Sequence, residues 1–431
     1  MNKTKETFVF GFAIFAAFFG AGNLILPPFL GFNSGPDWWL VTLGFITSAT
    51  VIPLLALFAH ARLQGTMLDF GYKVSPLFSL IFSICVYTIA IALPCPRTAA
   101  VTHEMAVQPF FGSSSLLTSS IYFALVFVFV INRGSVLQIL GKYLTPFIVL
   151  ILLAIVGMGI FLPTEEMNPS TFDVPVVAGL LEGYQTYDAL AGLLTGGIVI
   201  ISLNRLKGNI SFEDKKSIIA KSGLIAMFGL LIIYAGLIGL GALYNSQFDS
   251  DVTRTELLSG LSLKTLGNIG TSFLSVLVAL ACFTTAVGII VGTADFFKGL
   301  FKESQLAYTI TAIISCILGI SVGQFDVHYI IDVALPALMF IYPITIVLIL
   351  LNVIPEKYAS KMVFRAVVLV AFLFSIPDFM QFIIPKDNLI IFQNLIPLSQ
   401  YSLGWLIPAL IVFVLVNLVK LYFKEEPKAI Q

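Results

Sequence analysis

The chain has 431 residues, of which 58% are apolar and only 11% are charged. Ordinary soluble proteins are about 25% charged, so this composition excludes a water-soluble globular protein, and it equally excludes disordered and coiled-coil classes. The 23 basic and 23 acidic residues cancel, which leaves no overall field for nucleic acid. The four cysteines lie in apolar stretches without metal-ligand spacing, and we predict that they are core residues.

Apolar stretches long enough to cross a bilayer, about 20 residues each, recur along the whole chain. The uncharged ones are Thr7–Pro36, Trp38–Ala61, Val74–Pro96, Met105–Asn132, Tyr143–Thr164, Ser222–Phe248, Thr265–Ala294, Ser304–Phe325, Val333–Pro355 and Asn388–Val419. Two more contain acids: Val174–Leu203, with Glu182 and Asp188, and Ala366–Pro385, with Asp378. The sequence therefore predicts an all-α membrane protein with 12 transmembrane helices.

Basic residues indicate how these helices are oriented. With a cytoplasmic N-terminus and strict alternation, 19 of the 23 lysines and arginines fall in cytoplasmic segments. Such a bias follows the positive-inside rule. It predicts that both termini are cytoplasmic.

The first apolar stretch has features that interrupt a helix. Gly20–Asn23 places two glycines and an amide in mid-span, and Pro27 and Pro28 follow. Glycine frees the backbone and proline lacks a donor, so we predict a broken helix. The alternative is an intact helix in which Ala16 and Gly20 form a close-packing face.

The sixth stretch has a second interruption, within Gly179–Gly192. Glu182 and Asp188 are costly in hydrocarbon and normally face a cavity or a partner, so we predict a second broken helix. The alternative is that a loop interrupts this stretch.

The two interruptions lie five helices apart, which is typical of transporters built from two inverted five-helix repeats. We predict one membrane transport domain over residues 1–431. In it, the first repeat covers about 7–164, the second covers about 173–355, and two extra helices cover about 362–423. Discontinuous helices at matching positions form the substrate site in such proteins.

Thr284 and Thr285 lie in the middle of the eighth stretch. Their hydroxyls are possible oxygen ligands for a hard cation. The alternative is that each one donates to a carbonyl of the preceding helical turn.

Four segments resemble the branched-chain amino acid:cation symporters of the carrier II type. They are Phe12–Ile25 with Pro27-Pro28, Pro94–Ala99, Leu181–Leu190 and Phe283–Gly288. The resemblance covers nearly the whole chain in order. It implies a LeuT-like fold in a bacterial inner membrane and sodium-driven uptake of leucine, isoleucine and valine.

The resemblance also implies the site residues. A sodium ion, the co-transported cofactor, would bind the carbonyls of Ala16, Phe19 and Ala281 and the hydroxyls of Thr284 and Thr285. The amino acid would bind at the two breaks, with its carboxylate at the first and its ammonium at the second. The implied substrate-binding residues are Gly20, Ala21, Gly22, Asn23, Glu182, Gly183, Tyr184, Tyr187 and Asp188. Gln185 and Tyr187 are less apolar than an aliphatic pocket requires, which leaves selectivity open.

Several roles stay open at this point. Glu182 either balances the substrate ammonium or holds the broken helix, and Arg97 either closes an external gate with an acid such as Asp332 or extends to the membrane surface. Proton-coupled transport or exchange of other neutral amino acids, with Glu182 or Asp188 carrying the proton, is the alternative function. A membrane enzyme is disfavoured because the three histidines are scattered. The expected partners are the amino acid and lipid, with no nucleic acid and no obligate protein partner.

Overall fold

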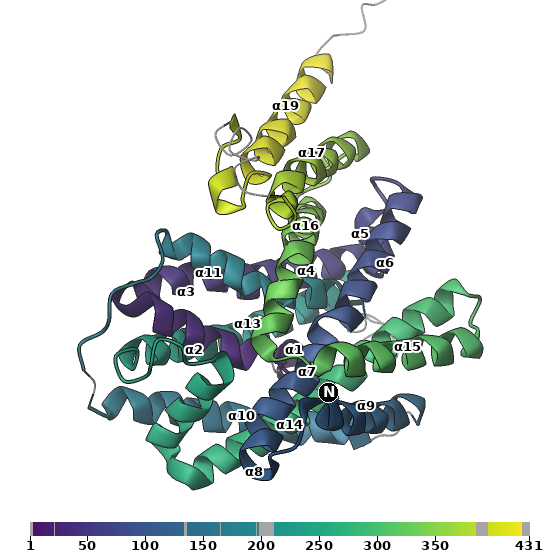
Figure 1. The fold of residues 1–431 in the computed structure, drawn as a ribbon. Coiled ribbons are helices and arrows are strands. Elements are labelled where there is room, and N and C mark those ends of the chain that lie inside the picture. The colour runs from purple at the N-terminus through teal and green to yellow at the C-terminus, as the bar shows by residue number, and fades with distance from the viewer. Residues whose placement is uncertain are drawn as a thin grey trace, which may run out of the picture. The chain divides into compact units, whose positions relative to one another are not determined.

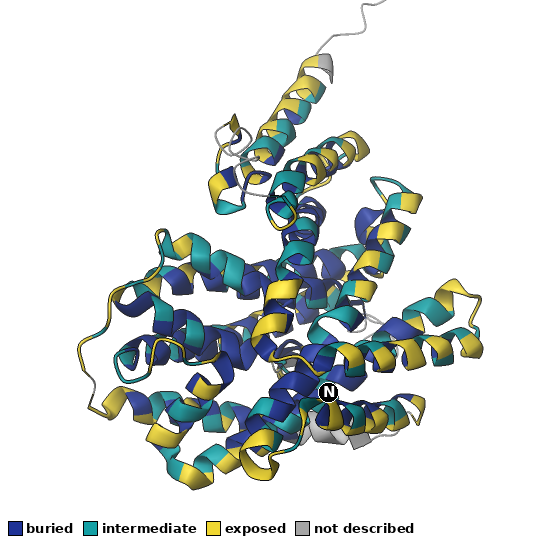
Figure 2. Ribbon diagram, in the orientation of Figure 1, coloured by how far each residue is buried: buried dark blue, intermediate teal, exposed yellow. Residues whose placement is uncertain are grey.

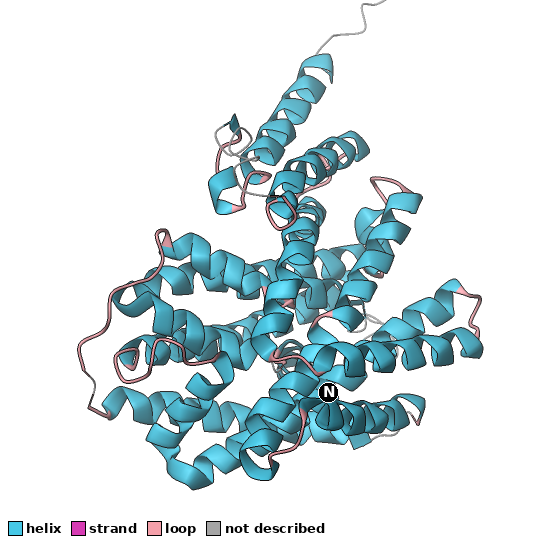
Figure 3. Ribbon diagram, viewed as in Figure 1, coloured by secondary structure: helices cyan, strands magenta, loops and turns pink. Residues whose placement is uncertain are grey.

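The computed structural model describes residues 3–20, 22–132, 136–163, 165–194, 196–197, 211–384 and 395–424. Within these ranges every regular element is a helix (Figure 1, Figure 3). The predicted all-α class is therefore confirmed.

Most helices in the first part of the chain are short. They are α1 (Lys3–Phe18), α2 (Gly22–Ser34), α3 (Trp38–Ile46), α4 (Ile52–Leu63), α5 (Met67–Gly71), α6 (Pro76–Ala92), α7 (Pro94–Thr102), α8 (Gln108–Phe111), α9 (Ser115–Ile131) and α10 (Val136–Phe161). A 3-10 turn, η1 (Gly35–Asp37), and two π-helical turns, η2 (Thr47–Val51) and η3 (His103–Val107), join consecutive helices.

The second part of the chain has longer helices. They are α11 (Pro175–Tyr184), α13 (Phe212–Leu243), α14 (Arg254–Leu300), α15 (Gln305–Gly323), α16 (Val327–Val353), α17 (Lys361–Met380) and α19 (Leu406–Lys424). Residues 188–194 are also helical, and η5 (Ser399–Tyr401) is a 3-10 turn. Gly267 interrupts α14 with a φ of 68°.

The described residues include eight helical segments that are long and apolar enough to cross a membrane. Three shorter apolar helices, Thr7–Phe18, Ser115–Ile131 and Leu406–Tyr422, accompany them. The chain thus has the helices of a multi-pass membrane protein, while the total of 12 stays a prediction.

The predicted boundary between the third and fourth stretches is wrong. Helix α7 begins at Pro94, and η3 and α8 continue the helical path to Phe111. Proline is tolerated at a first helical position because its missing N–H has no helical partner there. Gly112, with a φ of 57°, ends this path, and the Ser114 side chain caps α9. Arg97 therefore lies inside a helix and not at the end of one.

The chain divides into two compact units. The first comprises Met1–Val51, Tyr87–Asp188 and Lys221–Ala334, and the second comprises Ile52–Val86, Ala189–Ala220 and Leu335–Gln431. Both helix interruptions fall in the first unit. The proposed repeat boundaries at 7–164 and 173–355 stay a prediction.

Exposed residues recur along several helices (Figure 2), and many of them have large apolar side chains. On α15 they recur at Leu306, Ile310, Ile313, Ile314 and Ile317. A soluble protein rarely exposes a continuous apolar face. This face of α15 is therefore suited to contact with lipid.

Helices α3 and α11, which are far apart in the sequence, pack closely through glycines. A Cβ atom at Gly179 would collide with the carbonyl oxygen of Val41, and one at Gly44 would collide with that of Val176. Close approach of two backbones requires small residues in membrane helices. These glycines thus determine how α11 lies beside α3.

We expect Gly179→Ala to destabilise the protein, because the methyl group meets backbone atoms that cannot rotate away. Overpacking of this kind typically costs about 1–3 kcal/mol. Thermal unfolding of the purified protein would show a lower melting temperature. Gly157→Ala in α10 is the control, since a Cβ there meets no described atom within 4 Å. An equally stable Gly179→Ala protein would contradict the packing role.

Candidate functional site: two broken helices joined by a buried polar cluster

The first helix is interrupted where the sequence predicted it. Helix α1 ends at Phe18 and α2 begins at Gly22, and Ala21 lies outside the described residues. The amide of Gly20 donates to the carbonyl oxygen of Phe18 at 2.9 Å, whereas a continuing helix would direct it to Ala16. The Gly20 amide, predicted to bind a carboxylate, thus has an internal acceptor, and the Ala16 carbonyl loses its regular helical donor.

Two prolines lie within α2, at Pro27 and Pro28. Neither has an N–H group, so the carbonyls of residues 23 and 24 lack their helical donors. The polar backbone at the start of α2 therefore extends beyond the break itself.

The second interruption follows α11, which ends at Tyr184. The Thr186 hydroxyl donates to the Gly183 carbonyl at 2.8 Å and accepts from the Asp188 amide at 3.2 Å. Tyr187 has a φ of 61°, which is unusual for a residue with a side chain. One threonine thus satisfies backbone groups on both sides of the break, and the helix resumes at Asp188.

A buried polar cluster joins the two breaks. The side-chain amide of Asn23 lies 2.9 Å from one carboxylate oxygen of Asp188 and 2.6 Å from the hydroxyl oxygen of Tyr234 in α13. Tyr234 in turn donates to the other Asp188 oxygen at 3.0 Å. The same Asn23 amide donates to the Phe18 carbonyl at 2.8 Å. The structure thus brings Asn23 and Asp188 together, and sequence reasoning missed Tyr234, a hydroxyl in an otherwise apolar span.

Arg97 points inward, so the predicted extension to the membrane surface is wrong, while its predicted role in an external gate stays a prediction. Its guanidinium donates to the backbone carbonyl of Gln185 at 2.9 Å and lies 5.2 Å from the ring centre of Tyr187. Only 4% of the residue is exposed, so it does not reach the membrane surface. The Asp332 carboxylate lies 3.5 Å from Nε2 of His328. Arg97 instead supports the backbone of the second break.

Glu182 pairs with Arg254 at 3.2 Å. The Arg254 guanidinium also lies 2.8 Å from Nδ1 of His328 and 4.5 Å from the ring centre of Phe29. Glu182 thus has a cationic partner within the protein. Its contact with a substrate ammonium stays a prediction.

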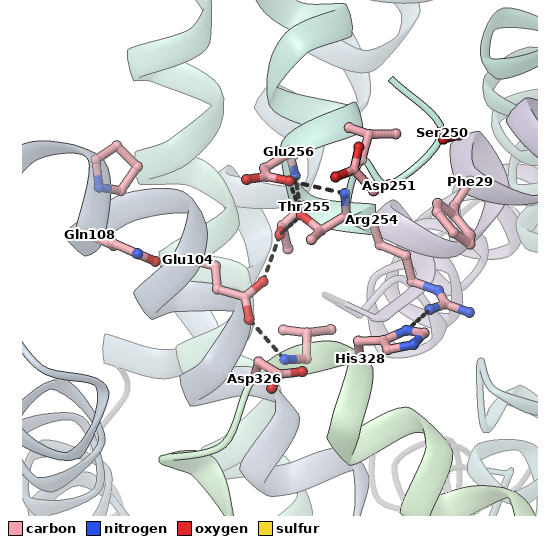
Figure 4. A pocket seen from close by; sticks show the side chains of 14 residues that line it. Phe29, Glu104, Gln108, Ser250, Asp251, Arg254, Thr255, Glu256, Asp326 and His328 are labelled. Atoms are coloured by element: carbon pink, nitrogen blue, oxygen red, sulfur yellow. Dashed lines mark hydrogen bonds between the residues drawn. The ribbon is translucent and has the colours of Figure 1, made fainter. Parts of the chain in front are cut away.

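A cavity of about 740 Å³ lies beside this ion pair (Figure 4). Glu104 connects the segments that line this cavity. Its carboxylate accepts hydrogen bonds from the Thr255 hydroxyl at 2.6 Å and from the Val327 amide at 2.8 Å. Figure 4 shows His328 and Arg254 in contact on the side of the cavity nearest Phe29. The cavity lining is rich in polar and charged side chains.

Of the three predicted sodium ligands in α14, Thr285 lies beside the first break. A Cβ atom added to Gly20 would lie 3.6 Å from both the hydroxyl oxygen and the methyl carbon of Thr285. The Thr284 hydroxyl donates to the Ala281 carbonyl at 3.0 Å, which is the local bond that the alternative interpretation expected. All five predicted ligands, Ala16, Phe19, Ala281, Thr284 and Thr285, offer neutral oxygen atoms, a donor set that suits a hard monovalent cation.

Gly183 and Tyr184 are packed against other parts of the protein. A Cβ atom at Gly183 would collide with the Ser48 hydroxyl, so this glycine allows α11 to approach η2. Tyr184 is buried, with 1% exposed. Their predicted contact with substrate stays a prediction.

The sequence matches a family model described as "Branched-chain amino acid transport protein" over residues 3–422. This chain belongs to that family. It is 34% identical to the branched-chain amino acid transport system 2 carrier protein of Pseudomonas aeruginosa, covering 96% of this chain and 95% of the relative. It is 31% identical to the branched-chain amino acid permease BraB of Bacillus subtilis, covering 94% of each.

Similar solved structures identify the fold of this transporter. This chain is similar to Mhp1 in its inward-facing conformation, with a TM-score of 0.61 and 12% sequence identity. The match covers 97% of this chain and 91% of the Mhp1 chain. A manganese transporter from Eremococcus coleocola covers 95%, with 94% of its own chain matched, a TM-score of 0.59 and 13% identity. At such low identity these likenesses show the fold alone, and they agree with the predicted LeuT-like class. The protein is a membrane transporter and not an enzyme.

Proposed function

We propose that the transporter is a sodium-coupled symporter that imports leucine, isoleucine and valine by alternating access. The observation that carries this proposal is the contact of Asn23 with Asp188, which joins the two helix breaks in one buried cluster. Broken helices supply the unpaired backbone groups that bind a zwitterion and a cation in transporters of this architecture. The names of the relatives in Pseudomonas and Bacillus support the substrate class.

The proposed sodium site lies between the first break and α14. Thr285 faces Gly20, and the Gly20 amide donates to Phe18 and not to the Ala16 carbonyl. Because every ligand is neutral, the bound ion keeps its charge. One such charge moving through 100 mV is worth about 2.3 kcal/mol, which is enough to drive accumulation. For that energy to drive transport, binding of sodium and substrate must also change the balance between the outward-facing and inward-facing states.

Proton-coupled transport or exchange of another neutral amino acid is the second candidate. Asp188 favours it, because a carboxyl group that is 1% exposed between the two breaks is a plausible carrier of a proton. Labelled leucine, isoleucine, valine and alanine would be offered to proteoliposomes under a sodium or a proton gradient applied separately. Sodium stimulation of branched-chain uptake supports the main proposal. Stimulation by protons alone would replace it with the second.

The proposal includes a bacterial inner-membrane location with both termini in the cytoplasm. The distribution of lysine and arginine supports this orientation.

We expect Thr285→Ala to raise the sodium concentration for half-maximal uptake by about 10-fold or more. Losing one oxygen contact to a charged group costs about 1.5–3 kcal/mol, and each 1.4 kcal/mol is about tenfold. Measuring leucine uptake at a series of sodium concentrations would give this half-maximal concentration. Thr293→Val is the control, since Thr293 is a buried hydroxyl in the same helix that donates to the Ile289 carbonyl. An unchanged sodium dependence in Thr285→Ala would argue against the site.

A further inference from the structure

Gln185 is held at the second break by its backbone and not by its side chain. Its carbonyl accepts from Arg97, and its amide donates to the Glu182 carbonyl at 3.0 Å. The side chain has no part in either bond. The conformation of the break therefore does not explain why an amide side chain is present at this position.

The Gln185 side chain is buried without a partner. Only 1% of the residue is exposed, and neither Nε2 nor Oε1 has a hydrogen-bond partner among the described residues. Buried side-chain polar atoms are bonded in the large majority of cases, and an unbonded one destabilises the fold. An amide with both ends unbonded at a helix break is what a protein retains when a ligand supplies the missing partners.

We propose that the Gln185 side chain binds the zwitterionic head group of the amino-acid substrate. This inference rests on the proposed function and deepens it. Nε2 donates and Oε1 accepts, so the two atoms complement a carboxylate and an ammonium on one α-carbon. Leucine, isoleucine and valine have no polar side-chain atom, so the head group is the only part of these substrates that can satisfy the amide. Gln185 would then select α-amino acids from other small branched molecules.

Gln185→Leu tests the inference with two measurements on the full-length, purified transporter. The melting temperature without ligand is expected to rise, because an apolar side chain replaces an unbonded buried amide. Leucine affinity is expected to fall at least about 10-fold, since hydrogen bonds to charged groups are lost. The preference for leucine over leucinol and over 4-methylpentanoate, which lack the carboxylate and the ammonium respectively, is expected to narrow.

Ser83→Ala is the matched control. Ser83 lies in α6 with 0% exposed, and its hydroxyl also has no partner within the described ranges. Its replacement is expected to raise the melting temperature and to leave leucine affinity unchanged. Gln185→Met provides a second, unbranched apolar variant if Gln185→Leu does not fold.

The outcomes separate the inference from the proposed function. Wild-type protein that binds no branched-chain amino acid would overturn both. Normal wild-type binding with unchanged leucine affinity in Gln185→Leu or Gln185→Met would overturn the inference alone. A lower melting temperature with unchanged affinity would likewise overturn it, because Gln185 would then have a purely structural role.

Discussion

Replacing Asp188 by alanine is expected to abolish transport. Its carboxylate accepts from Asn23 and from Tyr234, and hydrogen bonds to a charged group contribute about 1.5–3 kcal/mol each. Losing both bonds changes the equilibrium constant for forming the polar cluster by more than about 100-fold. The two breaks would also lose their shared contact. Initial rates of leucine uptake into proteoliposomes would measure the effect.

Asp378→Asn is the control for Asp188→Ala. Asp378 is another buried carboxyl group, 2% exposed, in α17. It lies in the second unit, whereas Asp188 lies in the first. We expect Asp378→Asn to retain uptake. If Asp188→Ala transports leucine at the wild-type rate, the polar cluster is not part of the transport site.

Replacing Arg97 by methionine is expected to eliminate uptake and also to lower the melting temperature. The guanidinium donates to the Gln185 carbonyl and lies over the Tyr187 ring, where the left-handed conformation of Tyr187 costs about 1–3 kcal/mol. Without this support, the second break no longer has a fixed backbone. We expect Arg97→Lys to recover only part of the activity, because lysine lacks the planar group that stacks on aromatic rings.

Arg62→Met separates the role of Arg97 at the break from a general need for an arginine that donates to backbone carbonyls. Arg62 donates to the carbonyls of Val353 and Ile354, so its loss also removes bonds to backbone oxygens. We expect Arg62→Met to lower the melting temperature while the affinity for leucine stays at the wild-type value. An Arg97→Met protein with normal uptake would show that the break holds its conformation without the guanidinium.

The two helix breaks could be predicted because their causes are local. Gly20 and Gly22 free the backbone, Pro27 and Pro28 remove donors, and Asp188 is costly in hydrocarbon wherever it occurs. These effects belong to the residue types themselves. They act in any helix within a membrane, so the sequence indicated both positions.

The boundary near Arg97 could not be predicted in the same way. A proline ends one helix or begins the next with the same local geometry, and Pro94 begins α7. The sequence therefore placed Arg97 at the outer end of a span. The structure buries it against the second break, and no local pattern distinguishes a snorkelling arginine from a buried one.

The sequence by itself determined the helical class, the positions of the breaks and the bias of basic residues. Hydrophobicity, backbone freedom and the cost of charge act residue by residue and need no partner. Only the tertiary structure decided which groups meet: Asn23 lies 165 residues from Asp188 and 211 from Tyr234. Such contacts depend on how whole helices pack, and it is this packing that turns two isolated breaks into one polar cluster.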